Sequence, residues 1–221
     1  MARVSHFWGM FDMEFNAEWF NDHLASMGQD FLWRKASMCP CVNPHSGAAK
    51  PGCLLCSGKG RSWANPVQVK AGMASERVLR QWAQFGRFEA GDAVLSVPEN
   101  SLLYDAGQFD RITMLNATDP FSLVLAHGQN DRINFPVQSI SRVYWIGSNN
   151  TVVEGGIPVI TSDGQLSWTI DAPPVGVQYS ISGTRYSEYF VWDELPGDRK
   201  HHYGARLPRK LVARRFDLFG R

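Results

Sequence analysis

The chain has 221 residues, of which 44% are hydrophobic and 19% charged, and its formal net charge is +1. This length suffices for one large or two small domains with a sizeable core, and the composition is that of a folded globular protein, which excludes wholesale disorder. The near-neutral balance also excludes a global attraction to DNA or membranes. Any such attraction must come from local patches of charge.

The amino terminus shows no targeting segment, because residues 1–12 are polar and soon acidic. No apolar run approaches the roughly 20 residues that a membrane helix needs. We therefore expect a chain that is made and kept in a reducing cytoplasm, away from membranes, where disulfides are rare. This expectation matters because all four cysteines fall between positions 39 and 56.

The first predicted element is a helix over residues 12–27. Asp12 can cap it, Glu14 suits its positive end, and Gly28 can end it. Large apolar residues recur on it at helical spacing: Phe15, Trp19, Phe20, Leu24 and Met27. We expect this stripe to pack on the protein's own core; the alternative is a helix that docks on a partner.

Beyond a loop at residues 39–60, rich in Cys, Pro and Gly, the sequence is typical of short strands separated by turns. Strands are predicted at 93–97, 109–115, 122–126, 133–146, 158–161, 166–170, 177–182 and 189–192, with turns at 116–120 and 147–150 and a hairpin at Asp163-Gly164. Pro136 is expected at an edge or a bulge. Residues 75–86 fit a short helix and a strand equally well.

This spacing of strands predicts a mainly β protein, a barrel or a sandwich, with an N-terminal helix and a four-cysteine zinc knuckle. Four segments are expected: the helix and an arm at 1–35, the knuckle at 36–62, a β-barrel core at 63–147, and a second β segment with a basic C-terminal tail at 148–221. Glycines and small polar residues at 147–156 mark the last boundary.

The cysteines form two close pairs, Cys39-Pro40-Cys41 and Cys53-Leu54-Leu55-Cys56, with eleven residues between them. In an extended segment residues i and i+2 point the same way, so both thiolates of the first pair can face one ion. The second pair has the CxxC spacing of a turn that folds two sulfurs around a metal. Four thiolates suit tetrahedral zinc, so Cys39, Cys41, Cys53 and Cys56 are the predicted ligands of a structural zinc ion.

Three other interpretations of these cysteines stay open. They can be reduced, buried side chains without a metal, or they can form a disulfide. His45 can also replace one cysteine as a ligand. An open catalytic zinc is disfavoured, because four sulfurs leave no position for water.

The sequence lacks the motifs of common enzymes. The run Ser57-Gly58-Lys59-Gly60-Arg61 departs from a phosphate-binding loop, because Gly60 stands where Ser or Thr is needed. HExxH, GxSxG and GxGxxG do not occur. His201 and His202 are adjacent, so in a regular element they point apart. We expect no catalytic residue and no enzymatic activity.

Charge is distributed in patches along the chain. Residues 1–30 contain five acidic residues and one basic residue, residues 31–75 contain six basic residues and no acid, and residues 199–215 contain seven basic residues and no acid. The plain interpretation is solvated surface charge. The functional ones are contact with nucleic-acid phosphates, or assembly in which the acidic patch of one subunit meets the basic patch of the next.

The tail at 207–221 also carries large apolar side chains: Leu211, Val212, Phe216, Leu218 and Phe219. A solvated tail rarely keeps so many of them. Either the chain's own sheet or another subunit must cover them. Together with the stripe on the N-terminal helix, they suggest assembly through the two termini.

Several segments taken together resemble a known family. They are Trp33-Arg34-Lys35 with Cys39-Pro40-Cys41, then Cys53-Leu54-Leu55-Cys56-Ser57-Gly58-Lys59-Gly60, Gly91-Asp92-Ala93-Val94-Leu95-Ser96-Val97-Pro98, Phe109-Asp110-Arg111-Ile112 and Leu207-Pro208-Arg209-Lys210. The set resembles neck proteins of tailed bacteriophages, of the head-to-tail connector or head-closure type.

This resemblance implies a β-barrel subunit of the virion, made in the host cytoplasm. Such a subunit assembles with itself into a ring around the DNA channel, between the portal or adaptor and the tail proteins. Contact with the DNA would be non-specific, and no catalytic residues come with the resemblance. The alternative function is a nucleic-acid-binding zinc-knuckle module that uses residues 31–75, with Trp33 and Trp63 as stacking rings, although the neutral overall charge speaks against it. An enzyme with an unrecognised site is the third hypothesis.

Overall fold

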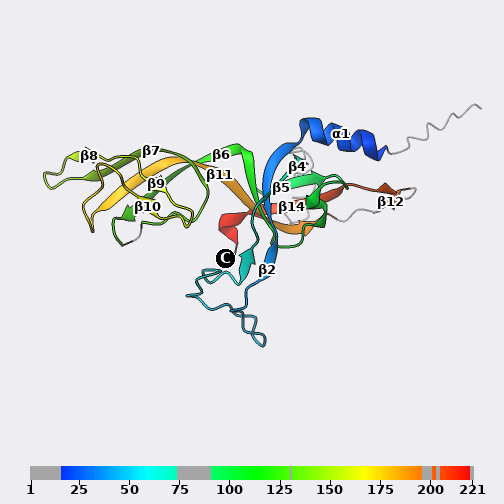
Figure 1. Ribbon diagram of the computed structural model, residues 1–221, viewed down its shortest axis with the longest axis horizontal. Coiled ribbons are helices and arrows are strands. Elements are labelled where there is room, and N and C mark those ends of the chain that lie inside the picture. The colour runs from blue at the N-terminus through cyan, green and yellow to red at the C-terminus, as the bar shows by residue number, and fades with distance from the viewer. Residues whose placement is uncertain (1–15, 74–90, 130, 196–200, 203–204, 220–221) are drawn as a thin grey trace, which may run out of the picture.

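The computed structural model describes residues 16–73, 91–129, 131–195, 201–202 and 205–219. The protein is elongated and mainly β (Figure 1). A barrel lies at one end, a long β arm extends to the other, and a loop hangs from the barrel. The helix α1 (Ala17–Met27) lies against the barrel on the side away from this loop.

Six antiparallel strands close the barrel. In order around it they are β1 (Gln29–Arg34), β4 (Val67–Met73), β5 (Ala93–Val97), β14 (Arg209–Arg215), β11 (Gln178–Glu194) and β6 (Arg111–Ala126). The circle closes because β14 pairs with both β5 and β11. Closure leaves the barrel without an exposed strand edge, and it confirms the prediction of a mainly β barrel with an N-terminal helix.

The barrel core is made by inward-facing residues of all six strands. Phe31, Leu95, Ile112 and Leu211 are each at most 2% exposed. The 3-10 helix Leu102–Asp105 contributes Leu103, which is fully buried. Burial of each large side chain contributes roughly 1.5 to 3 kcal/mol, so this interior is the main source of the barrel's stability.

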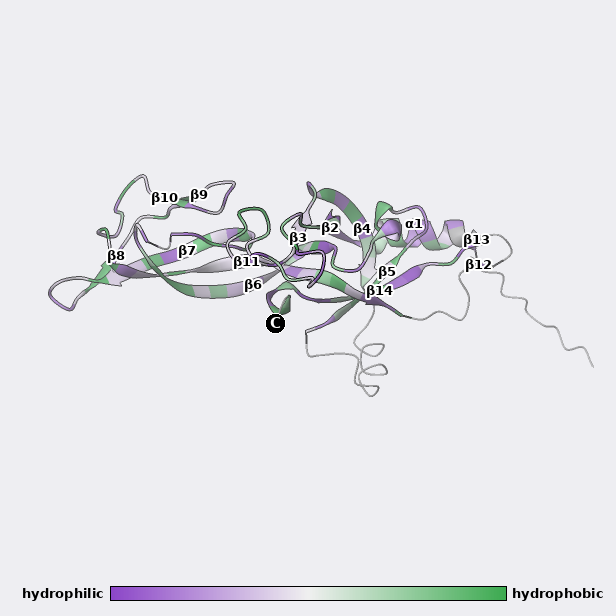
Figure 2. Cartoon of the chain, turned by 90° about the horizontal axis from the view of Figure 1, so that it is seen from below, coloured by the Kyte–Doolittle hydropathy of each residue, from purple (hydrophilic) through white to green (hydrophobic). Residues whose placement is uncertain are grey.

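The arm consists of the outer halves of the two longest strands with further short strands added. β6 has 16 residues and β11 has 17, and both continue beyond the barrel. β7 (Val137–Ile146) pairs with β11, β8 (Val152–Glu154) pairs with β7, and β9 (Val159–Ile160) and β10 (Leu166–Ser167) form a separate hairpin. A second core fills the space beneath them: Leu125, Ile133, Val143, Leu166, Tyr179 and Ile181. Figure 2 shows the hydropathy changing in bands along β6 and β11.

The predicted turn at 116–120 is wrong, because β6 runs through these residues without a break. Their Asn, Thr, Asp and Pro favour turns locally, but pairing with β11 supplies the backbone hydrogen bonds of an extended strand. Pro120 is tolerated because β6 beyond Met114 pairs with β11 on one side, and on its other side no strand of the described residues pairs with it. Likewise, the predicted strands 177–182 and 189–192 are parts of one strand, β11.

The other predicted strands agree with the structure to different degrees. Residues 93–97 are β5 as expected, and the Asp163-Gly164 hairpin joins β9 to β10, with Gly164 at a φ of +83°. Strand 133–146 begins at Val137, directly after Pro136. The predicted barrel segment, 63–147, supplies three of the six barrel strands, since β1, β11 and β14 lie outside it. Residues 75–86 lie outside the described part of the chain.

The helix α1 buries part of its predicted stripe. Its N-cap is Asn16, whose side chain accepts a hydrogen bond from Trp19, and Gly28 ends it with a hydrogen bond to Leu24. Leu24 is 8% exposed and fits against Gly72 of β4, where any side chain would collide with it. Trp19 and Met27 stay exposed. Asp12, Glu14 and Phe15 fall outside the described residues.

The C-terminal tail is an internal strand of the barrel and does not form a free docking segment. In β14, Leu211, Val212 and Ala213 are at most 2% exposed, and Phe216 of the following 3-10 helix (Phe216–Leu218) is also buried. Three of the tail's arginines pair with acids of the same chain: Arg209 with Glu194, Arg214 with Asp92, and Arg215 with Asp119. Before β14, β12 (His201–His202) and β13 (Ala205–Arg206) form a small hairpin.

Candidate metal centre

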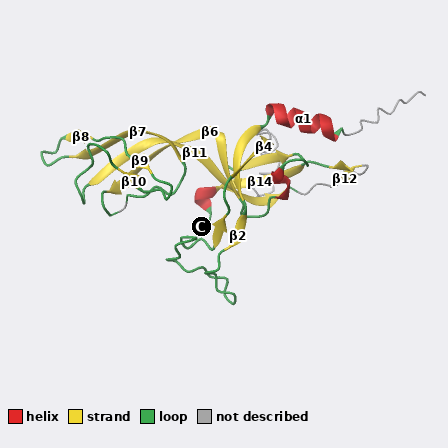
Figure 3. Ribbon diagram, viewed as in Figure 1, coloured by secondary structure: helices red, strands yellow, loops and turns green. Residues whose placement is uncertain are grey.

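The four cysteines lie on a loop carried by a short β stem. β2 (Ala36–Met38) follows β1 directly and pairs with β3 (Arg61–Trp63), and residues 39–60 between them, here called the knuckle, contain no helix or strand (Figure 3). Within the knuckle, Cys39 and Cys56 alone are buried. A segment with so little burial cannot hold one conformation by apolar packing alone.

The knuckle brings the four sulfurs together. The Sγ atoms of Cys39 and Cys53 are 3.7 Å apart, those of Cys41 and Cys56 are 3.5 Å apart, and all four lie within 4.8 Å of one another. A tetrahedral zinc ion with Zn–S bonds of about 2.3 Å separates its sulfurs by about 3.8 Å. The cysteines are free thiols, and the arrangement can hold one metal ion. His45 is not part of the group.

Backbone hydrogen bonds shape the two cysteine turns. Cys39 N–H donates to Gly60 across the stem, Ser57 N–H donates to Cys53, and Lys59 N–H donates to Cys56. Ser57 and Gly58 follow the CxxC pair at φ values of +50° and +81°, in the left-handed region. This chain reversal turns both sulfurs of the pair inward, and glycine makes the reversal accessible at little cost.

The thiols differ in acidity because each sulfur has different backbone donors and different hydrogen bonds to its neighbours. The backbone N–H groups of Cys56 and Leu55 lower the pKa of Cys53 to about 6, against the effect of burial. The Lys50 N–H lowers the pKa of Cys41, but burial and the three neighbouring thiols raise it to about 12. Cys53 is therefore more acidic than Cys41, and a divalent cation would stabilise the deprotonated form of both.

Asp110 attaches the stem to the barrel. Its side chain, 1% exposed, accepts hydrogen bonds from the Trp33 indole at 2.8 Å, the Ala36 backbone at 2.7 Å and the Gly107 backbone at 3.0 Å. Ala36 is the first residue of β2. One carboxylate thus fixes the point at which the chain leaves the barrel to form the knuckle.

Replacing Asp110 with alanine should lower the free energy of unfolding by about 3 to 5 kcal/mol, because three partly buried donors would lose their shared, buried acceptor. Urea denaturation followed by tryptophan fluorescence measures the effect. Asp193→Ala is the matched control, since that exposed carboxylate accepts a hydrogen bond from the adjacent Glu194 N–H. Equal stability of the two variants would show that Asp110 does not anchor the stem.

An aromatic cluster lies where the knuckle stem meets the end of the barrel. The Trp63 ring contacts Phe216 and Phe219 edge to face, with centroids 5.3 and 5.6 Å apart. Lys59 lies 4.3 Å from the centre of the Phe216 ring, and Arg61 lies 4.4 Å from that of Phe109. The basic residues of the knuckle base thus contact the chain's own rings.

These contacts bear on the nucleic-acid hypothesis. The Trp33 indole is bound to Asp110, and the Trp63 indole donates to the Phe109 carbonyl while its ring packs on the phenylalanines. Both tryptophans therefore serve the junction between stem and barrel. The predicted pair of base-stacking rings gains no support from this arrangement.

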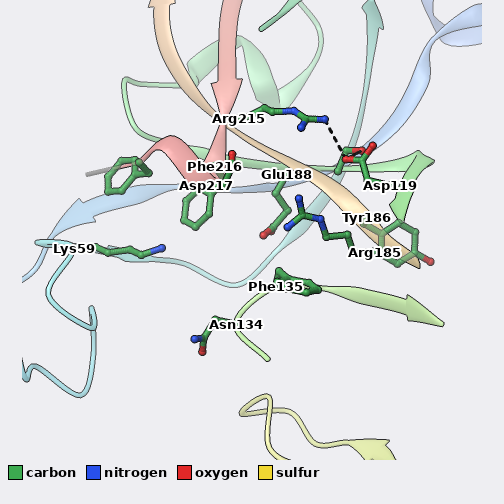
Figure 4. Close-up of a pocket in the computed structure, with 12 residues that line it drawn as sticks. Lys59, Asp119, Asn134, Phe135, Arg185, Tyr186, Glu188, Arg215, Phe216 and Asp217 are labelled. Atoms are coloured by element: carbon green, nitrogen blue, oxygen red, sulfur yellow. Dashed lines mark hydrogen bonds and ion pairs between the residues drawn. The ribbon is translucent and has the colours of Figure 1, made fainter. Parts of the chain in front are cut away.

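A cavity of ≈ 280 Å³ lies beside the aromatic cluster, between the knuckle base, β11 and the C-terminal end (Figure 4). Its wall includes Lys59, Asp119, Phe135, Arg185, Glu188 and Phe216. The Glu188 oxygens already accept two hydrogen bonds from Arg111, at 2.8 and 2.6 Å, and one from Thr113. Because Arg111 and Thr113 already donate to this carboxylate, it is not arranged as a general base.

The charges around Glu188 are mostly positive. Burial lowers the pKa of Lys59, and Arg111 lowers it further, while Glu188 opposes the shift. Burial and Arg111 likewise lower the pKa of Arg34, and Glu188 again opposes the shift. Glu188 therefore stabilises a group of cations at the junction of barrel, arm and knuckle, and sequence patterns gave no sign of this role.

A second polar cluster in the arm was also not foreseen. Asp131 accepts from the Tyr179 hydroxyl at 2.6 Å and from the Gly128 backbone at 2.6 Å, and its other contact is His127 Nδ1 at 2.8 Å. Burial, followed by the Asp131 hydrogen bond, raises the pKa of Tyr179. The cluster fixes the end of β6 to the start of β11. The sequence could not reveal this cluster, because no motif links His127 and Asp131, which are four residues apart, to Tyr179.

The fold and the cysteines define this molecule as a closed antiparallel barrel with a possible four-cysteine metal centre on a short stem. The chain matches no protein-family model and no curated protein. Among the described residues, no helix is long and apolar enough to cross a membrane.

Proposed function

We propose that this protein is a structural component of a virion, a subunit of a ring in the neck of a tailed bacteriophage. The ring would join the portal or adaptor to the tail and surround the DNA channel. The proposal starts from the sequence resemblance described above. It is compatible with the closed barrel, which is a stable body from which other segments can project to meet neighbours.

The observation that carries the proposal is the distribution of exposed apolar side chains. Many of the exposed apolar side chains lie on the arm and on the knuckle, while others, such as Trp19, Met27 and Leu102, lie on or beside the barrel. Those of the arm are Val124, Ile146, Val152, Val159, Ile170 and Val175, and those of the knuckle are Leu54 and Leu55. Single exposed apolar residues are ordinary, but groups of them at projecting ends are typical of interaction surfaces. A subunit that contacts neighbours on several sides needs such surfaces.

In this proposal the metal is zinc and its role is structural. Four thiolates occupy all positions of a tetrahedral ion, so no site remains for water or substrate. The sulfur separations of 3.5 and 3.7 Å suit zinc–thiolate bonding. Zinc would order the knuckle, which buries little else. We infer no catalytic role for the protein.

The position in the virion can be tested by immuno-electron microscopy. An antibody against the chain should label the junction of head and tail on intact tailed particles from a lysate of the producing host. Particles lacking the protein should contain separate heads and tails, because the joint between them would be missing. Label confined to the capsid shell or tail tip, or its complete absence from particles, would contradict the proposal.

A further inference from the structure

The cavity beside the aromatic cluster contains two cations that make no polar contact of their own. Lys59 of the knuckle and Arg185 of β11 both line it, and their charged ends point toward its middle from opposite sides (Figure 4). Lys59 lies 4.3 Å from the centre of the Phe216 ring, and Arg185 lies 5.0 Å from that of Phe135. Within the residues that the structure describes, neither cation donates a hydrogen bond or forms an ion pair. Their donor groups therefore remain available to a ligand.

The carboxylates of the cavity wall do not neutralise these two cations. Glu188 accepts two hydrogen bonds from Arg111, at 2.8 and 2.6 Å. Asp119 forms an ion pair with Arg215 at 3.4 Å. Asp217, the third carboxylate of the wall, is exposed. Two of the three acids thus have arginine partners, and the two available cations outnumber the one acid that remains. The cavity consequently favours an anion.

The aromatic rings of the cavity are not arranged to stack on a nucleotide base. Lys59 and Arg111 each lie 4.3 Å from the centre of the Phe216 ring, which also stacks on Phe219 at an interplanar angle of 14°. Arg185 lies over the Phe135 ring. A base would have to displace these groups, and a DNA duplex presents its phosphates on a broad convex surface. A cavity of ≈ 280 Å³ instead suits a single acidic side chain.

We propose that this cavity binds the carboxylate of an aspartate or glutamate on an acidic segment of a partner protein. Arg185 would donate two hydrogen bonds from its planar guanidinium, the geometry that matches a carboxylate, and Lys59 would supply the second positive charge. The Lys59 N–H donates to the Cys56 carbonyl at 3.0 Å, so the knuckle determines where this cation lies. The inference goes beyond the proposed ring function, because it assigns the chemistry of a partner and does not depend on the ring.

Binding can be measured by fluorescence anisotropy at low ionic strength, with a labelled peptide of alternating glutamate and glycine. The full-length protein should bind this peptide but not a peptide with glutamine in place of glutamate. Arg185→Gln and Lys59→Gln should each weaken binding at least about tenfold, because each removes a charge-assisted hydrogen bond. Lys50→Gln is the matched control, since it removes an exposed knuckle cation that does not line the cavity, and it should bind as wild type does.

Metal content and thermal unfolding of each variant show that the knuckle and the barrel are retained. Lys59 is exposed, so its replacement tests the site independently of any loss of stability in Arg185→Gln. Wild-type affinity in Lys59→Gln or in a folded Arg185→Gln, or an equal loss in Lys50→Gln, would overturn the proposal. A short DNA duplex provides the second probe. Duplex binding that depends on Lys59 and Arg185, without peptide binding, would assign the cavity to phosphate and also overturn it.

Discussion

Removing residues 207–221 should abolish cooperative folding of the barrel. The deletion takes away β14, which pairs with β5 on one side and β11 on the other, and so it opens the closed sheet. It also removes the buried side chains of Leu211, Val212 and Phe216. At about 1.5 to 3 kcal/mol for each, the loss is comparable with the entire stability of a typical domain, about 5 to 15 kcal/mol. Circular dichroism during thermal denaturation measures the result.

A milder substitution provides the control for this deletion. Leu211→Ala should lower the free energy of unfolding by about 2 to 5 kcal/mol, whereas Lys210→Ala, at the exposed neighbouring position, should change it by less than about 0.5 kcal/mol. If the truncated chain still unfolds cooperatively near the wild-type temperature, β14 is not an essential barrel strand. The result decides between an internal strand and a tail that docks on neighbours.

Metal removal should unfold the knuckle and leave the barrel intact. Structural zinc contributes apparent binding free energies of about 10 to 16 kcal/mol in small zinc-finger peptides, and here it would order residues 39–60, where only two side chains are buried. Chelation, or Cys53→Ser, should therefore increase hydrogen exchange across 39–60 with little change in the barrel portion of β6. Ser57→Ala, one residue beyond the CxxC pair, is the control and should keep one metal per chain. Unchanged exchange after complete metal removal would show that the knuckle folds without it.

The affinity of the centre for metal should rise with pH. The pKa of Cys41 is raised to about 12 and that of Cys39 is also raised, so these thiols are protonated at neutral pH and must release protons when metal binds. Proton release makes binding more favourable as pH increases and less favourable as it falls. Below about pH 6, Cys53 also becomes protonated, and metal should be lost more steeply. Metal retention after dialysis at a series of pH values measures this; retention independent of pH from 5 to 8 would exclude the cysteine ligands.

The barrel and the knuckle are stabilised by different interactions. Apolar burial and strand closure stabilise the barrel, whereas the knuckle depends on its sulfurs and on the anchor at Asp110. A loop ordered by metal can present Leu54 and Leu55 in one conformation without a core of its own. In the proposed ring, metal removal should therefore weaken assembly without unfolding the subunit.

Local patterns in the sequence were sufficient for several features. The two cysteine pairs are each held by their own turn, and the stem that joins them is short, so spacing alone predicted the cluster. Gly28 ends the helix, residues 93–97 form a strand, and Asp163-Gly164 forms a hairpin turn. In each case neighbouring residues determine the conformation, and the information is contained within a few positions.

Only the tertiary structure decided the features that depend on distant partners. Residues 116–120 favour a turn locally, but pairing with a strand more than 60 residues later keeps them extended. The apolar composition of Leu211 to Phe216 does not show whether another subunit or the chain's own sheet covers them. In the structure the closure of the barrel buries them. Asp110 likewise resembles any turn aspartate until Trp33 and Ala36, 77 and 74 positions away, donate to it. Long-range pairing and burial determine these positions, because their energies exceed the local preferences of the residues involved.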